Sequence, residues 1–418
     1  MLLALAMVLP VLAALASPFP GHAAAAGCDA AEPLPEEAQL SSADRALLAL
    51  ARELPLEVKV GQLLMPGFVG LLPDAGLLDR ARRGHVGGFF LLQRNVRDAA
   101  QLAQLTAGLS QAAAEGSLGL RPLLATDFEG GTVNTLRAII GATSPAAALA
   151  SLSPSEVEAR GARDAAVLAS LGFNTNLAPV ADVLSASGGI IGTRAFSSDP
   201  LVVEALSRAY LRGLQSAGIL GVMKHFPGHG STADDSHVVL PVVSRSLPEL
   251  EAADLLPYRR AIAAGEAQAV MVGHLLVPTL DPEAPASLSY PIVTGLLRRQ
   301  LGFDGLVITD ELKMGAISGT YGVTPAALLA LRAGVDVILA DYTGAEQDAV
   351  EQALIAACRA GQLPPGRIDR SVARILRLKL AHGLAGPDLV ARYRQLLAWP
   401  TLPRPRPSRR RRRRRRLS

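Results

Sequence analysis

Short apolar runs recur eight times along the chain, and this recurrence limits the fold more than any other feature. Each run is four to six residues long and ends at glycine, proline or a polar residue, which is typical of a buried strand. The candidate strands span residues 61–65, 86–91, 122–126, 173–178, 219–224, 269–273, 306–309 and 335–340.

Segments between these runs have the apolar spacing of helices. The clearest cover residues 163–171, 202–217, 247–264, 292–301 and 325–333. Parallel strands need such crossover helices, and eight strand and helix units predict an α/β fold of the (β/α)8 TIM-barrel type. We expect a single catalytic domain over residues 51–395, preceded by a linker over 27–50.

The first 26 residues are almost wholly apolar and end in an alanine-rich stretch, which predicts a signal peptide and a periplasmic or secreted protein. Cys28 directly after it suggests an alternative, a lipid-anchored protein associated with the cell envelope. If the segment is not a working signal, the protein is cytoplasmic. The other cysteine, Cys358, lies in an alanine-rich segment, so no disulfide scaffold is expected.

Residues 396–418 form a tail rich in proline and arginine, which we expect to be disordered. The tail contains eight consecutive arginines, Arg409 to Arg416; without them the net charge of +4 becomes −4. The high isoelectric point therefore belongs to the tail. No aromatic residues interleave with the arginines, so we expect no nucleic-acid partner, and the chain is predicted to be a monomer.

Polar side chains stand at or near the ends of five predicted strands. These are Asp127, the pair Lys224 and His225, His274, Asp310 and Asp341. A lone aspartate after a strand is often only a helix cap. Five such positions at the carboxyl ends of barrel strands predict a site, because these ends share one face of the barrel.

Three of the seven histidines, His225, His229 and His237, lie within thirteen positions, close to Asp234 and Asp235. Imidazoles and carboxylates in one loop are groups suited to proton transfer. A metal site is the alternative, but Pro227 and Gly228 separate the first two histidines, so they do not share a helix face. We expect neither a metal nor a cofactor.

Six ordered motifs, at 127–131, 176–183, 192–196, 224–241, 285–289 and 305–316, resemble glycoside hydrolase family 3 over residues 58–384. Within that family the chain is similar to single-domain β-N-acetylglucosaminidases of the peptidoglycan-recycling type. The resemblance implies a retaining, exo-acting β-N-acetylhexosaminidase that acts on a carbohydrate and forms a covalent glycosyl-aspartate. Family 3 β-glucosidases and N-acetylglucosaminide phosphorylases remain alternatives, as does a non-catalytic cell-wall sugar-binding protein.

The resemblance also implies roles for individual residues. Asp310 matches the nucleophile, and its neighbour Glu311 is the competitor by position. His237 matches the general acid/base, oriented by Asp235, with Asp234 as the rival partner. The family positions that hold the sugar are matched by Asp127, Arg194, Lys224 and His225.

The chain departs from the family pattern at two positions. Thr132 and Thr135 stand where two arginines are usual. The second arginine normally contacts the sugar, and Arg137 lies two residues further on. Loss of one charged hydrogen bond costs about 1.5–3 kcal/mol, which changes specificity more readily than it abolishes catalysis.

Overall fold

The computed structural model describes residues 40–185, 189–342 and 344–398. The predicted signal peptide over 1–26, Cys28 and the arginine run from Arg409 to Arg416 lie outside these residues. No helix within the described residues is long and apolar enough to cross a membrane.

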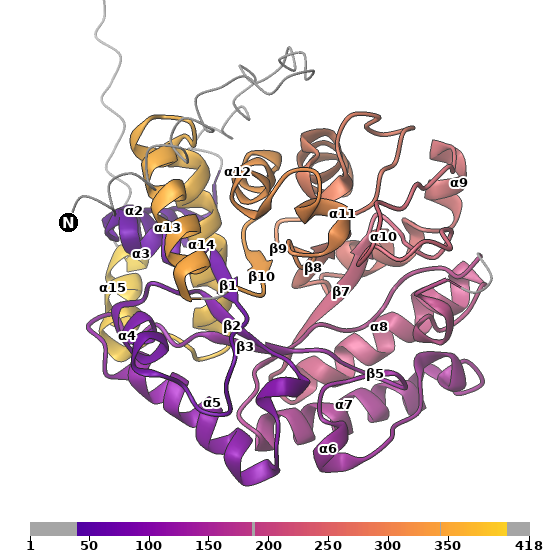
Figure 1. Cartoon of the computed structure of the whole chain (residues 1–418), viewed down its shortest axis with the longest axis horizontal. Helices are drawn as coiled ribbons and strands as arrows, with labels where there is room; N and C mark the ends of the chain where they lie inside the picture. Colours follow the sequence, from indigo (N-terminus) through magenta and orange to yellow (C-terminus); the bar gives the residue numbers. More distant parts are fainter. Residues whose placement is uncertain (1–39, 186–188, 343, 399–418) are drawn as a thin grey trace, which may run out of the picture.

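Eight short strands run parallel to one another at the centre of the molecule (Figure 1). Six form one sheet in the order β2-β3-β6-β7-β8-β9, and β1 pairs with β10. Single parallel bridges from Gly67 to Phe90 and from Ile308 to Val337 connect the two sheets. The strands are β1 (Leu64–Pro66), β2 (Gly88–Leu91), β3 (Leu123–Thr126), β6 (Thr175–Asn176), β7 (Leu220–Phe226), β8 (Ala269–Val272), β9 (Leu306–Thr309) and β10 (Ile338–Ala340).

Helices surround this curled sheet (Figure 1). They are α2 (Ser42–Glu53), α3 (Leu56–Gln62), α4 (Ala75–Arg83), α5 (Ala99–Ala114), α6 (Arg137–Ile140), α7 (Pro154–Ser170), α8 (Pro200–Ser216), α9 (Leu247–Ala252), α10 (Leu256–Ala263), α11 (Gly315–Ser318), α12 (Val323–Ala333), α13 (Gly344–Arg359), α14 (Pro365–Ala381) and α15 (Pro387–Ala398). A π-helix, η6, covers Pro291–Gln300, and short 3-10 helices cover η2 (Gln93–Asn95), η3 (Ala146–Leu149), η4 (Gly192–Arg194) and η5 (Ala286–Leu288). The result is an α/β fold with a curled parallel sheet, whereas a regular closed eight-stranded barrel stays a prediction.

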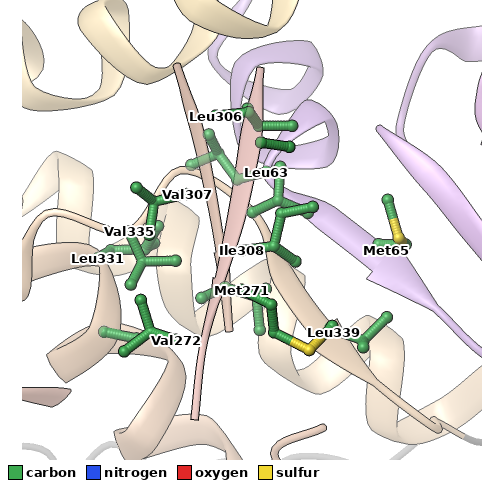
Figure 2. Close-up of a cluster of buried hydrophobic side chains, with 14 of the residues drawn as sticks. Leu63, Met65, Met271, Val272, Leu306, Val307, Ile308, Leu331, Val335 and Leu339 are labelled. Carbon is green, nitrogen blue, oxygen red and sulfur yellow. The ribbon is translucent and has the colours of Figure 1, made fainter. Parts of the chain in front are cut away.

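Side-chain alternation along the strands explains the near-continuous apolar runs. Figure 2 shows Val272 and Val307 on one side of their strands, with Leu331 of α12, and Met271 and Ile308 on the other side. All five side chains are buried. A strand buried on both faces needs apolar residues at every position, as parallel sheets covered by helices require.

All eight predicted strands overlap an observed strand, but two boundaries differ in ways that matter. Gly61 and Gln62 belong to α3, so β1 begins only at Leu64. β7 continues to Phe226, so Lys224 and His225 lie inside the strand and do not follow it.

Three predicted helices also differ in extent. The helix expected at 163–171 begins earlier, because Ser153 and Glu156 form a capping box and Pro154 takes the first turn. The segment 247–264 is divided into α9 and α10 by a turn at residues 253–255. The segment 292–301 is a π-helix.

The expected linker over 27–50 extends too far. From Ser42 the chain forms α2, whose first-turn donor Asp44 N–H is capped by the Ser41 hydroxyl. Leu47 and Leu50 of this helix are buried in the main core. The packed domain therefore begins at Ser42, nine residues before the predicted start at residue 51.

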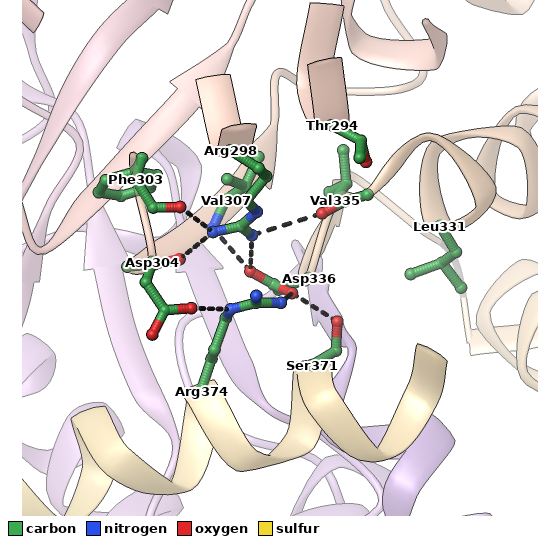
Figure 3. Close-up of polar contacts among 12 residues, drawn as sticks. Thr294, Arg298, Phe303, Asp304, Val307, Leu331, Val335, Asp336, Ser371 and Arg374 are labelled. Atoms are coloured by element: carbon green, nitrogen blue, oxygen red, sulfur yellow. Dashed lines mark hydrogen bonds and ion pairs between the residues drawn. The ribbon is translucent and has the colours of Figure 1, made fainter. Parts of the chain in front are cut away.

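A buried ionic cluster lies at the amino-terminal end of β10, away from the strand ends that carry the predicted site. Asp336 is fully buried and accepts hydrogen bonds from Arg298, from the Ser371 hydroxyl and from the Val307 N–H, as Figure 3 shows. Burial raises the pKa of Asp336, but the charges of Arg298 and Arg374 outweigh it and lower the pKa. This carboxylate joins η6, β9 and α14, which is a structural role.

Candidate active site

Lys224 and Arg194 meet two carboxylates at the carboxyl end of the sheet. The Lys224 ammonium lies 2.6 Å from Asp127 Oδ1 and 2.6 Å from Glu129 Oε1. Arg194 donates to both oxygens of Glu129, from Nε at 2.8 Å and from Nη2 at 2.9 Å. The four side chains therefore form one network that joins the segment after β3, including β4 (Phe128–Gly130), to β7 and η4.

Glu129 and Asp127 differ in exposure within this network. The Glu129 side chain is 3% exposed and the Asp127 side chain 23% exposed, so only Asp127 presents an oxygen to solvent. Burial raises the pKa of Glu129, but Lys224 and Arg194 outweigh burial and hold the pKa well below its usual range. Glu129 is thus a buried anion that positions two cations, and Asp127 is the carboxylate available to a ligand.

Asp182 fixes the orientation of the His225 ring. Its Nδ1 lies 2.7 Å from Asp182 Oδ2, and the backbone N–H groups of His225 and His229 donate to Asp182 Oδ1 at 3.2 and 2.8 Å. Because a carboxylate only accepts, Nδ1 carries the proton and Nε2 faces Arg194 Nη2, 3.4 Å away. His225 is fixed with Nε2 toward the network.

His229 is buried within its own loop. Its Nδ1 lies 3.0 Å from the Thr232 hydroxyl and its Nε2 lies 3.3 Å from the Ser236 hydroxyl. Burial lowers the pKa of His229. Both ring nitrogens are occupied by loop hydroxyls, which supports the interpretation that His229 shapes the loop.

His237 and Asp235 form a second pair, at the surface. His237 Nδ1 lies 2.7 Å from Asp235 Oδ1, which also accepts from the His237 N–H at 2.9 Å. The side chains are 61% and 41% exposed. The His237 carbonyl accepts from Gly315 N–H at 2.9 Å, so this loop is attached to the segment that follows Asp310.

Asp310 follows β9 directly, and its backbone N–H donates to Val272 at the end of β8. Its Oδ1 accepts from the Glu311 N–H at 2.9 Å, and within the described residues its Oδ2 accepts no hydrogen bond. Burial raises the pKa of Asp310, but electrostatic interactions with the His225 and His274 rings and the hydrogen bond from the Glu311 N–H outweigh burial and lower the pKa. Asp310 is therefore an ionised carboxylate with one unpaired oxygen.

The Glu311 carboxylate forms hydrogen bonds with neighbouring backbone groups. Its Oε1 accepts from the N–H groups of Lys313 and Asp341, at 3.0 and 2.8 Å, and burial raises its pKa. Glu311 therefore connects the end of β9 to the end of β10 through one of its carboxylate oxygens, and its pKa is shifted in the opposite direction from that of Asp310. Asp234, the rival of Asp235, has no hydrogen bond to His237 within the described residues.

The structure brings Asp127, Arg194, Lys224 and His225 together and places His237 with Asp235. The sequence prediction assigned no role to Glu129 or to Asp182. Alternation on extended backbone could have found Glu129, because residues two apart, such as Asp127 and Glu129, share a face. Asp182 lies 43 residues before His225, and no local pattern joins the two.

The two threonines differ in position. Thr132 is exposed, whereas Thr135 is buried and donates its N–H to the Asp127 carbonyl at 3.1 Å. Arg137 is an exposed residue at the start of α6. Among the described residues no three His, Cys, Asp or Glu side chains are grouped so that they could hold a metal ion.

Comparison with solved structures identifies proteins of the same fold. The chain superimposes on a glycoside hydrolase family 3 beta-N-acetylglucosaminidase from Paenibacillus sp. str. FPU-7 with a TM-score of 0.75 at 36% identity, covering 82% of this chain and 68% of that one. It superimposes on LpqI of Mycobacterium tuberculosis with a TM-score of 0.71 at 37% identity, covering 80% and 96%.

Comparison with known sequences leads to the same family. The chain is 40% identical over 333 residues to beta-hexosaminidase LpqI of Mycobacterium tuberculosis, covering 77% of this chain and 82% of the relative. It is 38% identical over 296 residues to beta-hexosaminidase of Xylella fastidiosa, covering 69% and 86%. Residues 55–378 match the model of the glycosyl hydrolase family 3 N terminal domain, and the chain belongs to this family.

Proposed function

We propose that the chain is a retaining, exo-acting β-N-acetylhexosaminidase that works at the carboxyl face of a (β/α)8 barrel. It removes terminal β-linked N-acetylglucosamine from peptidoglycan-derived or chitooligosaccharide-like glycosides. Family membership and the names of the relatives support the reaction class. The observation that carries the mechanism is the exposed His237 and Asp235 pair on a loop attached beyond Asp310.

In the first step Asp310 attacks the anomeric carbon through its unpaired Oδ2, and a carbon–oxygen bond forms as the glycosidic bond breaks. His237 gives its Nε2 proton to the departing oxygen. Nε2 is the nitrogen that can do so, because Nδ1 is committed to Asp235. The products are a glycosyl-Asp310 ester and the free alcohol.

In the second step the neutral His237 takes a proton from water at Nε2. The water oxygen attacks the anomeric carbon, the ester bond breaks, and the Asp310 carboxylate is restored. Two displacements at the same carbon retain its configuration. Asp235 stabilises the imidazolium and keeps the Nδ1–H tautomer in the neutral state.

In this proposal the sugar binds to the network of Lys224, Arg194, Asp127 and Glu129 and to His225. Asp127 accepts from hydroxyls, and Lys224, Arg194 and His225 present groups fixed by Glu129 and Asp182. Their hydrogen bonds are made before the substrate arrives, so little ordering is needed on binding.

The test is a panel of p-nitrophenyl glycosides, with and without phosphate, on the wild type and on His237→Ala. We expect preference for the N-acetylglucosaminide, free sugar as product, and a large loss of kcat in His237→Ala. His382→Ala is the matched control, because His382 bonds Gly218 and Gln268 at the opposite end of the strands.

Each other outcome contradicts one part of the proposal. Preference for the glucoside contradicts the substrate, and a sugar phosphate as product favours a phosphorylase. Undiminished turnover by His237→Ala contradicts the acid/base assignment. Sugar binding by a wild type without turnover favours a non-catalytic binding protein.

We also propose that the enzyme acts in the periplasm or outside the cell, on the basis of the apolar residues 1–26. The mass of the mature protein tests this. Removal of the segment supports export, and a lipid mass on Cys28 indicates envelope attachment.

A further inference from the structure

The motif at residues 285–289 has no place in the catalytic steps above. It forms the 3-10 helix η5, and both of its serines are buried, Ser287 at 0% exposure and Ser289 at 1%. Ser289 donates its hydroxyl to Asp281 at 2.6 Å. Ser287 instead lies 2.7 Å from Nδ1 of His274, two residues beyond β8.

His274 is fully buried and both of its ring nitrogens are occupied. Nε2 lies 3.0 Å from the carbonyl oxygen of Glu311. A carbonyl only accepts, so Nε2 carries the proton; in the neutral ring Nδ1 then accepts from the Ser287 hydroxyl. Burial lowers the pKa of His274, which agrees with a neutral ring. The two contacts determine both the tautomer and the orientation of the ring.

Glu311 forms backbone hydrogen bonds with both His274 and Asp310. The Glu311 N–H donates to Asp310 Oδ1 at 2.9 Å, while the Glu311 carbonyl accepts from His274. The Glu311 carboxylate is fixed separately by the Asp341 N–H. Residue 311 is therefore fixed at its carbonyl and its side chain, and its N–H points at one oxygen of Asp310.

We propose that Ser287 and His274 are positioning residues for Asp310, acting through Glu311. The hydroxyl fixes the imidazole, the imidazole fixes the Glu311 backbone at its carbonyl, and the Glu311 N–H donates to Asp310 Oδ1 so that Oδ2 faces the substrate. This inference rests on the proposed role of Asp310 as nucleophile. A small misplacement of a reacting atom lowers the rate of the chemical step without weakening contacts to the sugar.

The first test measures kcat and KM of single variants. A thermal unfolding curve for each variant checks that it is folded. We expect Ser287→Ala to lower kcat about 10-fold and His274→Leu about 100-fold, each with KM nearly unchanged. His274→Gln keeps a donor near the position of Nε2, and we expect it to recover much of the loss. A rise in KM at unchanged kcat would contradict the proposal, as would equal losses in His274→Gln and His274→Leu.

Ser289→Ala is the matched control, because it removes an equally buried hydroxyl from the same motif. Its partner is Asp281, which lies away from Asp310 in the hydrogen-bond network. We expect Ser289→Ala to lower thermal stability with little change in kcat. Equal kcat losses in Ser287→Ala and Ser289→Ala would mean a purely structural motif and would overturn the inference.

A double-variant cycle separates this inference from the proposed function. Asp310→Ala should lose turnover, and added azide should restore it by attacking the anomeric carbon and yielding the glycosyl azide. In this background Ser287→Ala should cause no further loss, because the group that it positions is gone. A further loss of azide-dependent rate overturns the positioning role, whereas full activity of Asp310→Ala without azide overturns the nucleophile itself.

Discussion

Two histidines of one short stretch, His225 and His237, each pair with an aspartate at the same distance. In both pairs Nδ1 lies 2.7 Å from a carboxylate oxygen. Their surroundings are opposite: the side chains of His225 and Asp182 are 6% and 0% exposed, and those of His237 and Asp235 are 61% and 41% exposed. Pairs with equal distances can therefore lie in very different environments, and we propose different functions for them.

The difference lies in what else each pair contacts. Asp182 also accepts two backbone N–H groups, and His225 Nε2 is directed toward Arg194 in the proposed sugar-binding network. In the surface pair Nε2 of His237 is left for solvent or substrate. The buried pair suits positioning and the exposed pair suits proton exchange, because proton exchange needs access to water and to the leaving group.

The largest expected effect is on catalysis, from His237→Ala. We expect kcat to fall about 100- to 10,000-fold, since a positioned acid/base contributes that much. The loss should be greater for N,N′-diacetylchitobiose than for the p-nitrophenyl glycoside, whose leaving group needs less protonation. Equal losses on both substrates would argue against a proton-transfer role.

Removal of Asp182 should act on stability instead. Asp182→Ala leaves His225 Nδ1 and two backbone N–H groups buried without their acceptor, and we expect a loss of about 3–5 kcal/mol in unfolding free energy. Urea unfolding followed by circular dichroism measures it. A loss below about 1 kcal/mol would mean that the buried pair is not structurally important.

The third effect tests the orienting carboxylate of the exposed pair. Asp235→Asn removes the carboxylate charge that strengthens the hydrogen bond from His237 Nδ1, and a hydrogen bond to a charged group contributes about 1.5–3 kcal/mol. This corresponds to a fall of about 10- to 100-fold in kcat, smaller than in His237→Ala because the imidazole remains. Asp234→Asn, one residue earlier, is the matched control and should leave kcat close to wild type.

The sequence predicted the strands and the catalytic face because both follow local rules. Apolar runs mark strands buried on two faces, and Asp127 and Asp310 come directly after such runs. The pairing of His237 with Asp235 was implied by the family resemblance, because position alone left Asp234 as a rival. These features could be found without any knowledge of the tertiary structure.

The missing parts depend on contacts between distant segments. Asp182 reaches His225 across 43 residues, and Glu129 becomes a buried partner of Arg194 across 65. The role of Glu311 was open from the sequence, since either it or Asp310 could face the sugar. The structure distinguishes them by contacts with distant residues: Glu311 Oε1 accepts from the N–H of Asp341, 30 residues away, and burial raises the pKa of Glu311, whereas the pKa of Asp310 is lowered.

The smallest effect concerns the stability contribution of the exposed pair. Asp235→Ala should change the unfolding free energy by less than about 1 kcal/mol at pH 7, because solvent screens the pair.

Burial raises the pKa of Asp235, but the hydrogen bonds from the His237 N–H and side chain outweigh burial and lower the pKa. A carboxylate with a depressed folded-state pKa stabilises the fold above its unfolded pKa of about 3.9, and this contribution is lost as the pH falls through the folded value. The wild type and Asp235→Ala should therefore converge in stability below about pH 4, whereas Asp182→Ala should stay destabilised there because its buried N–H donors still lack an acceptor. Equal convergence of both variants would mean that charge alone, and not burial, distinguishes the two pairs.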